Sequence, residues 1–149
     1  MSSKFTAILA AVFVMLVVCV QGQSAGGGLG VQKKIKFPEY DPVSGRIKSL
    51  LAGDRAIPQK NGILLVEGTR LETYVYEGKV RKLDLIITAP MCLFSFRTRV
   101  VSSDGPMRVD RADGTASLSG WGFVWNQKQS SLIVKDRVNT VMNQAVKQR

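Results

Sequence analysis

The sequence contains no histidine. Histidine is the commonest general base, the usual activator of serine and cysteine nucleophiles, and the commonest zinc ligand. Its absence argues strongly against a hydrolase or a zinc enzyme. The sequence also lacks a GxxxxGK[ST] motif, so it predicts no P-loop nucleotide site. We therefore expect a protein that is not an enzyme and that binds no cofactor and no metal ion.

Cysteine is scarce as well. Cys19 lies in an apolar N-terminal run and Cys92 stands alone, so no intramolecular disulfide forms once that run is removed or inserted into a membrane. Cys92 is most simply a small buried apolar residue. The carboxylates of Asp104, Asp110 and Asp113 lack the ordered spacing of a calcium loop, and we expect them to cap turns.

The N-terminus has the features of an export signal. Lys4 precedes 16 residues without a charge, and small residues follow. This run is long for a signal core, and it is shorter than the roughly twenty residues of a spanning helix. We expect residues 1–25 to be a signal peptide or a membrane anchor, with cleavage near Gly22 to Ala25 favoured, and residues 26–40 to be a flexible linker. These features predict export, with anchoring in a membrane if the segment is retained.

The chain is basic, with a formal net charge of +10. Such a charge favours anionic partners, and export makes nucleic acid a poor candidate compared with the anionic lipids of a cell envelope. Solubility alone is an alternative explanation, because charges spread over solvated faces need no partner.

Turn residues recur about every ten positions after residue 41, and alternating apolar runs lie between them. This pattern predicts an all-β antiparallel meander over residues 41–142, followed by a tail at 143–149. Periodicity alone leaves open whether the sheet closes into a barrel, forms a sandwich or stays half-open.

The stretch LSGWGFVWNQ, Leu118 to Gln127, gathers three large aromatic side chains. At a strand's period of two, Trp121, Phe123 and Trp125 share one face, while Gly120 and Gly122 leave the other nearly bare. The aromatic face is either an ordinary filled core or the lining of a cavity for an apolar ligand.

Three stretches together resemble a known family. They are DPVSGRIKSLLAGDRA (41–56), LIITAPMCLF (85–94) and SSDGPMRVDRADGTASLSGWGFVWNQKQSSLIVKDRV (102–138). Their order is similar to that of the periplasmic bridge proteins of lipopolysaccharide export, the LptC and LptA type with an OstA-like domain. The Asp41-Pro42 opening and the chain length favour the LptC branch. The resemblance implies one domain, a half-open, V-shaped antiparallel β jelly roll.

The resemblance also implies a location in the periplasm, with inner-membrane anchoring if residues 1–25 are retained, and a function without catalysis. Members of this family shield the acyl chains of lipopolysaccharide in an apolar groove. Their domains join edge to edge, from the inner-membrane ABC transporter towards the outer membrane. The expected partners are therefore lipopolysaccharide, the β domain of a neighbouring bridge protein, and the transporter permease.

Three sets of residues are candidates for these roles. The lipid-groove set is Leu85, Ile87, Phe94, Phe96, Gly120, Trp121, Gly122, Phe123 and Trp125. The candidates for anionic headgroups are Arg97, Arg99, Arg108, Arg111 and Arg137, because guanidinium groups pair with such anions in a bidentate way. The partner edge is expected in the last alternating run, at Val134, Val138, Val141 and Met142.

Each set has a simpler interpretation, namely filled core for the apolar residues and a solvated strand face for the arginines. Two other functions also stay open. One is an exported lipid carrier with a closed barrel, and the other is a basic adaptor with a solid core that docks on anionic membrane or glycan.

Overall fold

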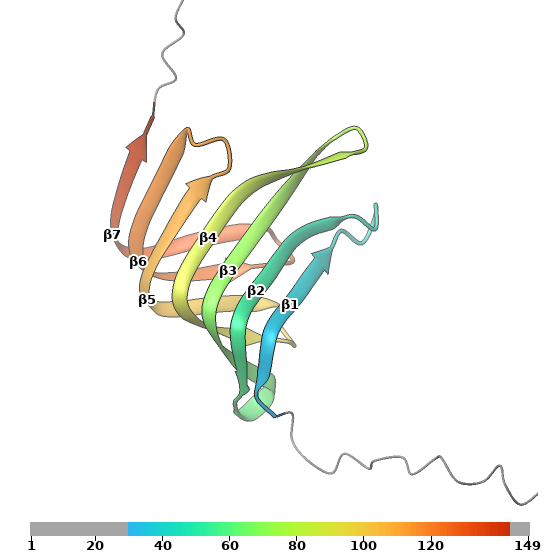
Figure 1. The fold of residues 1–149 in the computed structure, drawn as a ribbon, viewed down its shortest axis with the longest axis vertical. Coiled ribbons are helices and arrows are strands. Elements are labelled where there is room, and N and C mark those ends of the chain that lie inside the picture. Colours follow the sequence, from blue (N-terminus) through green and yellow to red (C-terminus); the bar gives the residue numbers. More distant parts are fainter. Residues whose placement is uncertain (1–29, 144–149) are drawn as a thin grey trace, which may run out of the picture.

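The computed structural model describes residues 30–143, which form one antiparallel sheet of seven strands in consecutive order (Figure 1). The strands are β1 (Gln32–Tyr40), β2 (Ile47–Pro58), β3 (Ile63–Glu77), β4 (Val80–Ser95), β5 (Val100–Arg111), β6 (Ala116–Asn126) and β7 (Ser131–Met142), and the short 3-10 helix η1 (Lys60–Gly62) links β2 to β3. Each strand pairs only with its neighbours along the chain, so β1 and β7 are both edges of the sheet. The predicted half-open antiparallel sheet is confirmed, and the closed-barrel alternative is wrong for the described residues.

The first strand begins earlier than the sequence suggested. Residues 32–40, which we assigned to a flexible linker, form β1 and pair with β2. The reason is the alternation of the inward Ile35 and Phe37 with lysines, which is a strand pattern with one apolar face. Pro38 is compatible with this position because β1 is an edge strand.

The predicted export segment and the tail beyond residue 143 lie outside the described residues. In the part of the chain that the structure describes, no helix has the length and apolar character needed to cross a bilayer.

The sheet is folded along a line that crosses every strand. The residues on this bend line are Lys34, Asp54, Gly68, Pro90, Gly105, Gly122 and Arg137. Four of them have a positive φ: 51° at Lys34, 64° at Gly68, 75° at Gly122 and 51° at Arg137. The strand pairing shifts register here between β4 and β5, β5 and β6, and β6 and β7. Bulges of this kind bend a strand and increase its twist, and Figure 1 shows the strands turning sharply along their length.

The bend line divides the sheet into two arms of a V. The upper arm contains residues 35–53, 69–89, 106–121 and 138–142, and the lower arm contains residues 32–33, 55–67, 91–104 and 123–136. The arms pack against each other through their inward faces, as an aromatic cluster shows. The Phe37 ring of the upper arm lies 5.2 Å from each of the Phe94 and Phe96 rings of the lower arm.

The turns between strands are held by short side chains. Asp41 Oδ1 accepts the backbone N–H groups of Val43 and Ser44, at 3.0 and 2.7 Å. These bonds, with those of Ser44 foremost, lower the pKa of Asp41. Asp113 caps the β5–β6 turn in the same way, as predicted, by accepting the N–H of Thr115 at 2.9 Å. The same prediction is wrong for Asp104 and Asp110, which lie within β5 and pair with Lys135 and Arg108.

Candidate functional site

The centre of the V is a filled core. Four of the predicted groove residues belong to it, since Ile87, Phe94, Phe123 and Trp125 are all buried. Leu85 packs against this cluster from its margin. Phe96 lies at the rim, 39% exposed, with its ring 5.1 Å from that of Phe94. The inward face at the centre of the V is therefore packed like any protein interior.

The prediction that Trp121 shares a face with Phe123 and Trp125 is wrong. Trp121 is 44% exposed on the outer face, where the guanidinium of Arg137 lies 5.3 Å from its ring centroid. The cause is Gly122, whose φ of 75° interrupts the alternation of the strand. Gly120 consequently faces the core along with Phe123, because a Cβ at Gly120 would meet the side chains of Val134 and Met107.

Gly120 and Gly122 therefore have separate reasons to lack a side chain. Gly120 lets the inward face of β6 approach β7, and a Cβ there would lie 2.5 Å from Cγ1 of Val134. Gly122 supplies the left-handed backbone of the bend, which costs other residues energy. Sequence alternation alone places both on a bare outer face, since it carries no information on a bulge.

The inward apolar face continues uncovered to the last strand. Thr140 is the register partner of Leu118, so Val138, Thr140 and Met142 lie on the same inward face as Leu118. Val138 is 54% exposed and Met142 is 76% exposed. Leu118, Val138 and Met142 form an apolar ledge on the open side of the V. At the ledge, the interior surface meets the free edge of β7.

The predicted edge residues have different surroundings. Val134 packs against the core, whereas Val138, Val141 and Met142 are exposed. Charges flank the bend of β7, where Lys135 pairs with Asp104 at 2.6 Å and Arg137 lies 3.9 Å from Asp136. Charged side chains on an edge strand discourage unspecific pairing. Val138 to Met142, beyond these charges, carries none.

The five predicted headgroup arginines are not brought together. Arg97 and Arg99 follow β4, Arg108 and Arg111 lie on upper β5, and Arg137 lies at the bend of β7. Four of them pair with carboxylates: Arg99 with Glu39, Arg108 with Asp110, Arg111 with Asp84 and Asp113, and Arg137 with Asp136. Hydrogen bonds that Arg108 donates to the Asp110 carboxylate raise the pKa of Arg108 above its usual value. Their role in binding a headgroup stays a prediction.

Arg99 has a structural task that the sequence did not reveal. Its guanidinium lies 2.6 Å from the Glu39 carboxylate, donates to the Pro38 carbonyl at 2.9 Å, and covers the Phe94 ring at 5.3 Å. A second contact lies nearby, where Lys48 Nζ donates to the carbonyl oxygen of Lys128 at 2.8 Å. Both contacts join the upper arm to the lower arm. We call these two contacts the latch, because they close one side of the V beyond the aromatic cluster.

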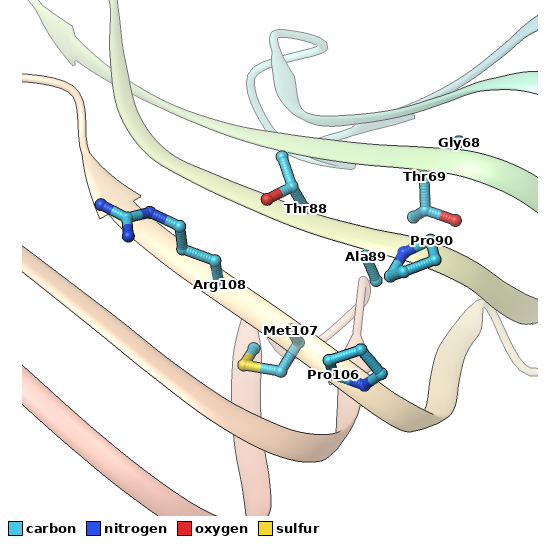
Figure 2. A pocket seen from close by; sticks show the side chains of 8 residues that line it. All are labelled: Gly68, Thr69, Thr88, Ala89, Pro90, Pro106, Met107 and Arg108. Carbon is cyan, nitrogen blue, oxygen red and sulfur yellow. The ribbon is translucent and has the colours of Figure 1, made fainter.

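Pairing between β4 and β5 is interrupted at the bend. It breaks between the pair Thr88–Arg108 and the pair Leu93–Ser102. A hollow of about 430 Å³ lies there, lined by Gly68, Thr69, Thr88, Ala89, Pro90, Pro106, Met107 and Arg108 (Figure 2). An adjoining hollow of about 410 Å³ shares Pro90 and Pro106 with it. Proline has no N–H, so both strands tolerate the missing ladder bonds.

The only described cysteine is buried beside this interruption. Thr69 Oγ1 lies 3.1 Å from Cys92 Sγ and donates to the Val66 carbonyl at 3.2 Å. Burial raises the pKa of the Cys92 thiol to about 11. As expected from the sequence, Cys92 is a buried apolar residue. Within residues 30–143, no group of three or more cysteine, aspartate or glutamate side chains is placed to hold a metal ion.

The chain matches no protein-family model and no curated protein sequence. Among solved structures, it is similar to LptH from Pseudomonas aeruginosa, described as the LptA-homologous periplasmic component of the conserved lipopolysaccharide transport device. The TM-score is 0.48 and the identity is 13%, over 76% of this chain and 94% of that chain. A similarity at this level decides neither the fold nor the function of the chain.

Proposed function

We propose that this protein is a non-enzymatic, exported domain that shields the acyl chains of a lipid, in the manner of the lipopolysaccharide-export bridge proteins that its sequence resembles. It acts in the periplasm and passes its lipid on. The LptC branch remains the favoured assignment on sequence grounds, with retention or cleavage of residues 1–25 deciding whether it is anchored in the inner membrane.

The observation that carries this proposal is the apolar ledge. An ordinary core ends where neighbouring elements cover it, whereas here the inward face runs out to β7 through exposed Val138 and Met142. Each CH₂ of an acyl chain gains about 0.8 kcal/mol when it is removed from water. An acyl chain that lies on the ledge would remove both its own CH₂ groups and the exposed side chains of the ledge from water.

The free edges explain why the domain would not act alone. Strands β1 and β7 each expose one row of backbone N–H and C=O groups along the edge of the sheet. A neighbouring β domain that adds a strand to β7 would extend the sheet beside the ledge. The apolar surface would then continue from one domain into the next, which is what a route for acyl chains through water requires.

Crosslinking in cells tests this proposal. A photo-crosslinking residue at Val138 or Met142 of the full-length chain should capture acylated glycolipid. The control position is Val43, an exposed apolar residue in the β1–β2 turn. Equal capture at ledge and control positions would count against a defined lipid surface.

A second candidate is the basic adaptor with a solid core. The complete burial of Phe94, Phe123 and Leu71 at the centre of the V favours it, because a filled interior needs no ligand. Two results distinguish these functions. An adaptor would bind vesicles according to their anionic lipid content and lose this binding in high salt, and it would leave the ledge positions without crosslinked lipid.

A further inference from the structure

Three polar side chains in the core lack a hydrogen-bonding partner among the described residues. They are Gln127, with both amide atoms and an exposed fraction of 0%, Ser49 with its hydroxyl, and Trp125 with its indole N–H. A buried polar group without a partner costs about 1–3 kcal/mol. Three of them in one small domain therefore require an explanation.

Two of these residues belong to one strand and its direct extension. Trp125 lies at an inward position of β6, and Gln127 follows two residues later with the same inward orientation, as its complete burial shows. The Gln127 backbone N–H donates to the carbonyl of Arg99 at 3.0 Å. Gln127 is thereby fixed directly beside the latch.

Ser49 comes from the opposite arm and lies at the same end of the interior. Its register partner on β1 is Glu39, which pairs with Arg99. Its neighbour Lys48 donates to the carbonyl of Lys128, the residue after Gln127. The latch therefore places Ser49 of β2 opposite Gln127, in the turn after β6, with the Phe37–Phe94 aromatic contact on their apolar side.

We propose that Ser49, Trp125 and Gln127 bind the neutral carbonyl linkage of an acyl ligand, an ester or an amide, whose hydrocarbon chain enters between the inward faces of the two arms when they separate. This inference rests on the proposed function and specifies its ligand. The indole N–H and the amide NH₂ group are donors for a carbonyl oxygen. The Gln127 carbonyl and the Ser49 hydroxyl accept the N–H or O–H of an amide or hydroxyacyl group.

The charges around the site favour a neutral group over an anion. Two cations belong to the latch. The Arg99 guanidinium is already paired with Glu39 and the Pro38 carbonyl, and the Lys48 ammonium donates to the Lys128 carbonyl. A carboxylate or phosphate buried here would have to compete with these partners for a counter-ion, which makes it more costly than a buried neutral carbonyl. Headgroup charges of the ligand would remain outside the latch, in water.

Binding of four probes, each with a twelve-carbon chain, to the purified full-length protein tests the proposed carbonyl site. The probes are dodecane, methyl dodecanoate, N-methyldodecanamide and the dodecanoate anion, each with a brominated chain that quenches tryptophan. A Trp121→Phe background leaves Trp125 as the only tryptophan. We expect the ester and amide to bind roughly tenfold more tightly than dodecane, in line with one or two net hydrogen bonds.

The variant Gln127→Leu should bring the ester and amide to within about twofold of dodecane, because it removes both amide atoms and leaves apolar contacts in place. Its stability should be unchanged or higher, since no unpartnered amide remains buried. Ser49→Ala gives a second, smaller change. Its matched control is Ser103→Ala, a buried serine whose hydroxyl already accepts the N–H of Gly105 at 3.2 Å.

The outcomes separate the two proposals. Equal affinity for dodecane and amide, or an unchanged preference in both Gln127→Leu and Ser49→Ala, overturns the carbonyl site and leaves the acyl-binding function standing. Tighter binding of dodecanoate than of the neutral probes also overturns the site, in favour of a charged headgroup. Failure of the wild-type chain to bind any probe, dodecane included, contradicts the proposed function itself.

Discussion

Glu39 on the first strand and Arg99 in the turn after the fourth strand lie 60 residues apart in sequence and 2.6 Å apart in space. Their pairing joins the two arms of a sheet that is otherwise open between β1 and β7. The pair is largely shielded, with 21% and 16% of the two side chains exposed. Its contribution to stability should therefore be intermediate. Exposed ion pairs contribute little, whereas disruption of fully buried ones is severe.

Replacing Arg99 with methionine should destabilise the fold by about 1–3 kcal/mol, because Glu39 keeps its charge in a partly buried place. The same variant should bind acyl probes faster, since the arms separate more easily. Denaturant unfolding and stopped-flow quenching of Trp125 measure the two effects. The matched control is Arg108→Met, whose pair with Asp110 lies on the outer surface and should cost under about 1 kcal/mol. Equal effects of the two variants would contradict a latch.

The bend at Gly122 predicts a difference between two glycines with the same backbone. Gly114 and Gly122 both have a φ of 75°, but a Cβ on Gly114 has open space, whereas one on Gly122 would lie 2.9 Å from Cδ of Lys135. Gly114→Ala should therefore cost about 1 kcal/mol, for the left-handed backbone alone. Gly122→Ala should cost about 2 kcal/mol, because the Lys135 side chain, which pairs with Asp104, must also move aside.

Thermal and denaturant unfolding of both variants decide this point. Equal destabilisation would show that Lys135 moves aside without cost and that Gly122 is needed only for its φ. A larger loss at Gly122, accompanied by a red shift in Trp125 emission, would show that the bend also sets how tightly β6 and β7 enclose the core.

The sequence predicted the class of the fold because alternation and turn residues are local signals. The β5–β6 turn at Asp113-Gly114 and the edge position of β7 are examples. The orientation of Trp121 was not predictable in this way, since one left-handed residue at Gly122 reverses the face of everything beyond it. The latch was also missed, because Glu39 and Arg99 meet only when the sheet folds over. Gln127 did leave a signal, as a polar residue that continues the inward alternation of Phe123 and Trp125.

Cys92 should be almost unreactive in the native protein. Its pKa of about 11 lies two units above the ordinary value of 9.0, so the thiolate fraction at pH 8 falls by about a hundredfold from this cause alone. In a Cys19→Ser chain, alkylation at pH 8 should be slow until denaturant is added. Thr69→Val should slow it further, because the Thr69 hydroxyl lowers the thiol pKa. Rapid native alkylation would show that the β4–β5 interruption opens in solution.

The raised pKa of the Cys92 thiol also makes the stability of the fold depend on pH. A raised thiol pKa favours the folded state while the thiol is protonated in both states. The contribution is complete below pH 9.0 and is lost as the pH rises from 9.0 through about 11. A Cys92→Ala chain should lack this component of alkaline destabilisation, whereas the component from Tyr74, whose pKa burial raises to about 12, should remain. Unfolding curves at pH 8, 10 and 11 compare the two chains.

Because β7 is a free edge, we expect proline to destabilise the fold at one of two positions on this strand and to be nearly neutral at the other. Successive residues of an edge strand point their N–H groups alternately at the neighbouring strand and at solvent. Val138 and Val141 are three residues apart, so one of them donates to β6 and the other points outward. Proline at the position whose N–H donates to β6 should lower the free energy of unfolding by about 3 kcal/mol. Proline at the other position should leave the melting temperature nearly unchanged and remove a donor that an added strand would use.

The stable proline variant is the informative one for docking. In cells, a photo-crosslinking residue at Thr140 of the full-length chain should trap a neighbouring β domain, and the stable proline should reduce that product severalfold while lipid capture at Met142 persists. Met142 lies at the end of β7 on the apolar ledge, so its lipid contact does not depend on the ladder. If the stable proline leaves the Thr140 product intact, the neighbour does not pair with β7, and the edge strand β1 becomes the place where a second domain extends the sheet.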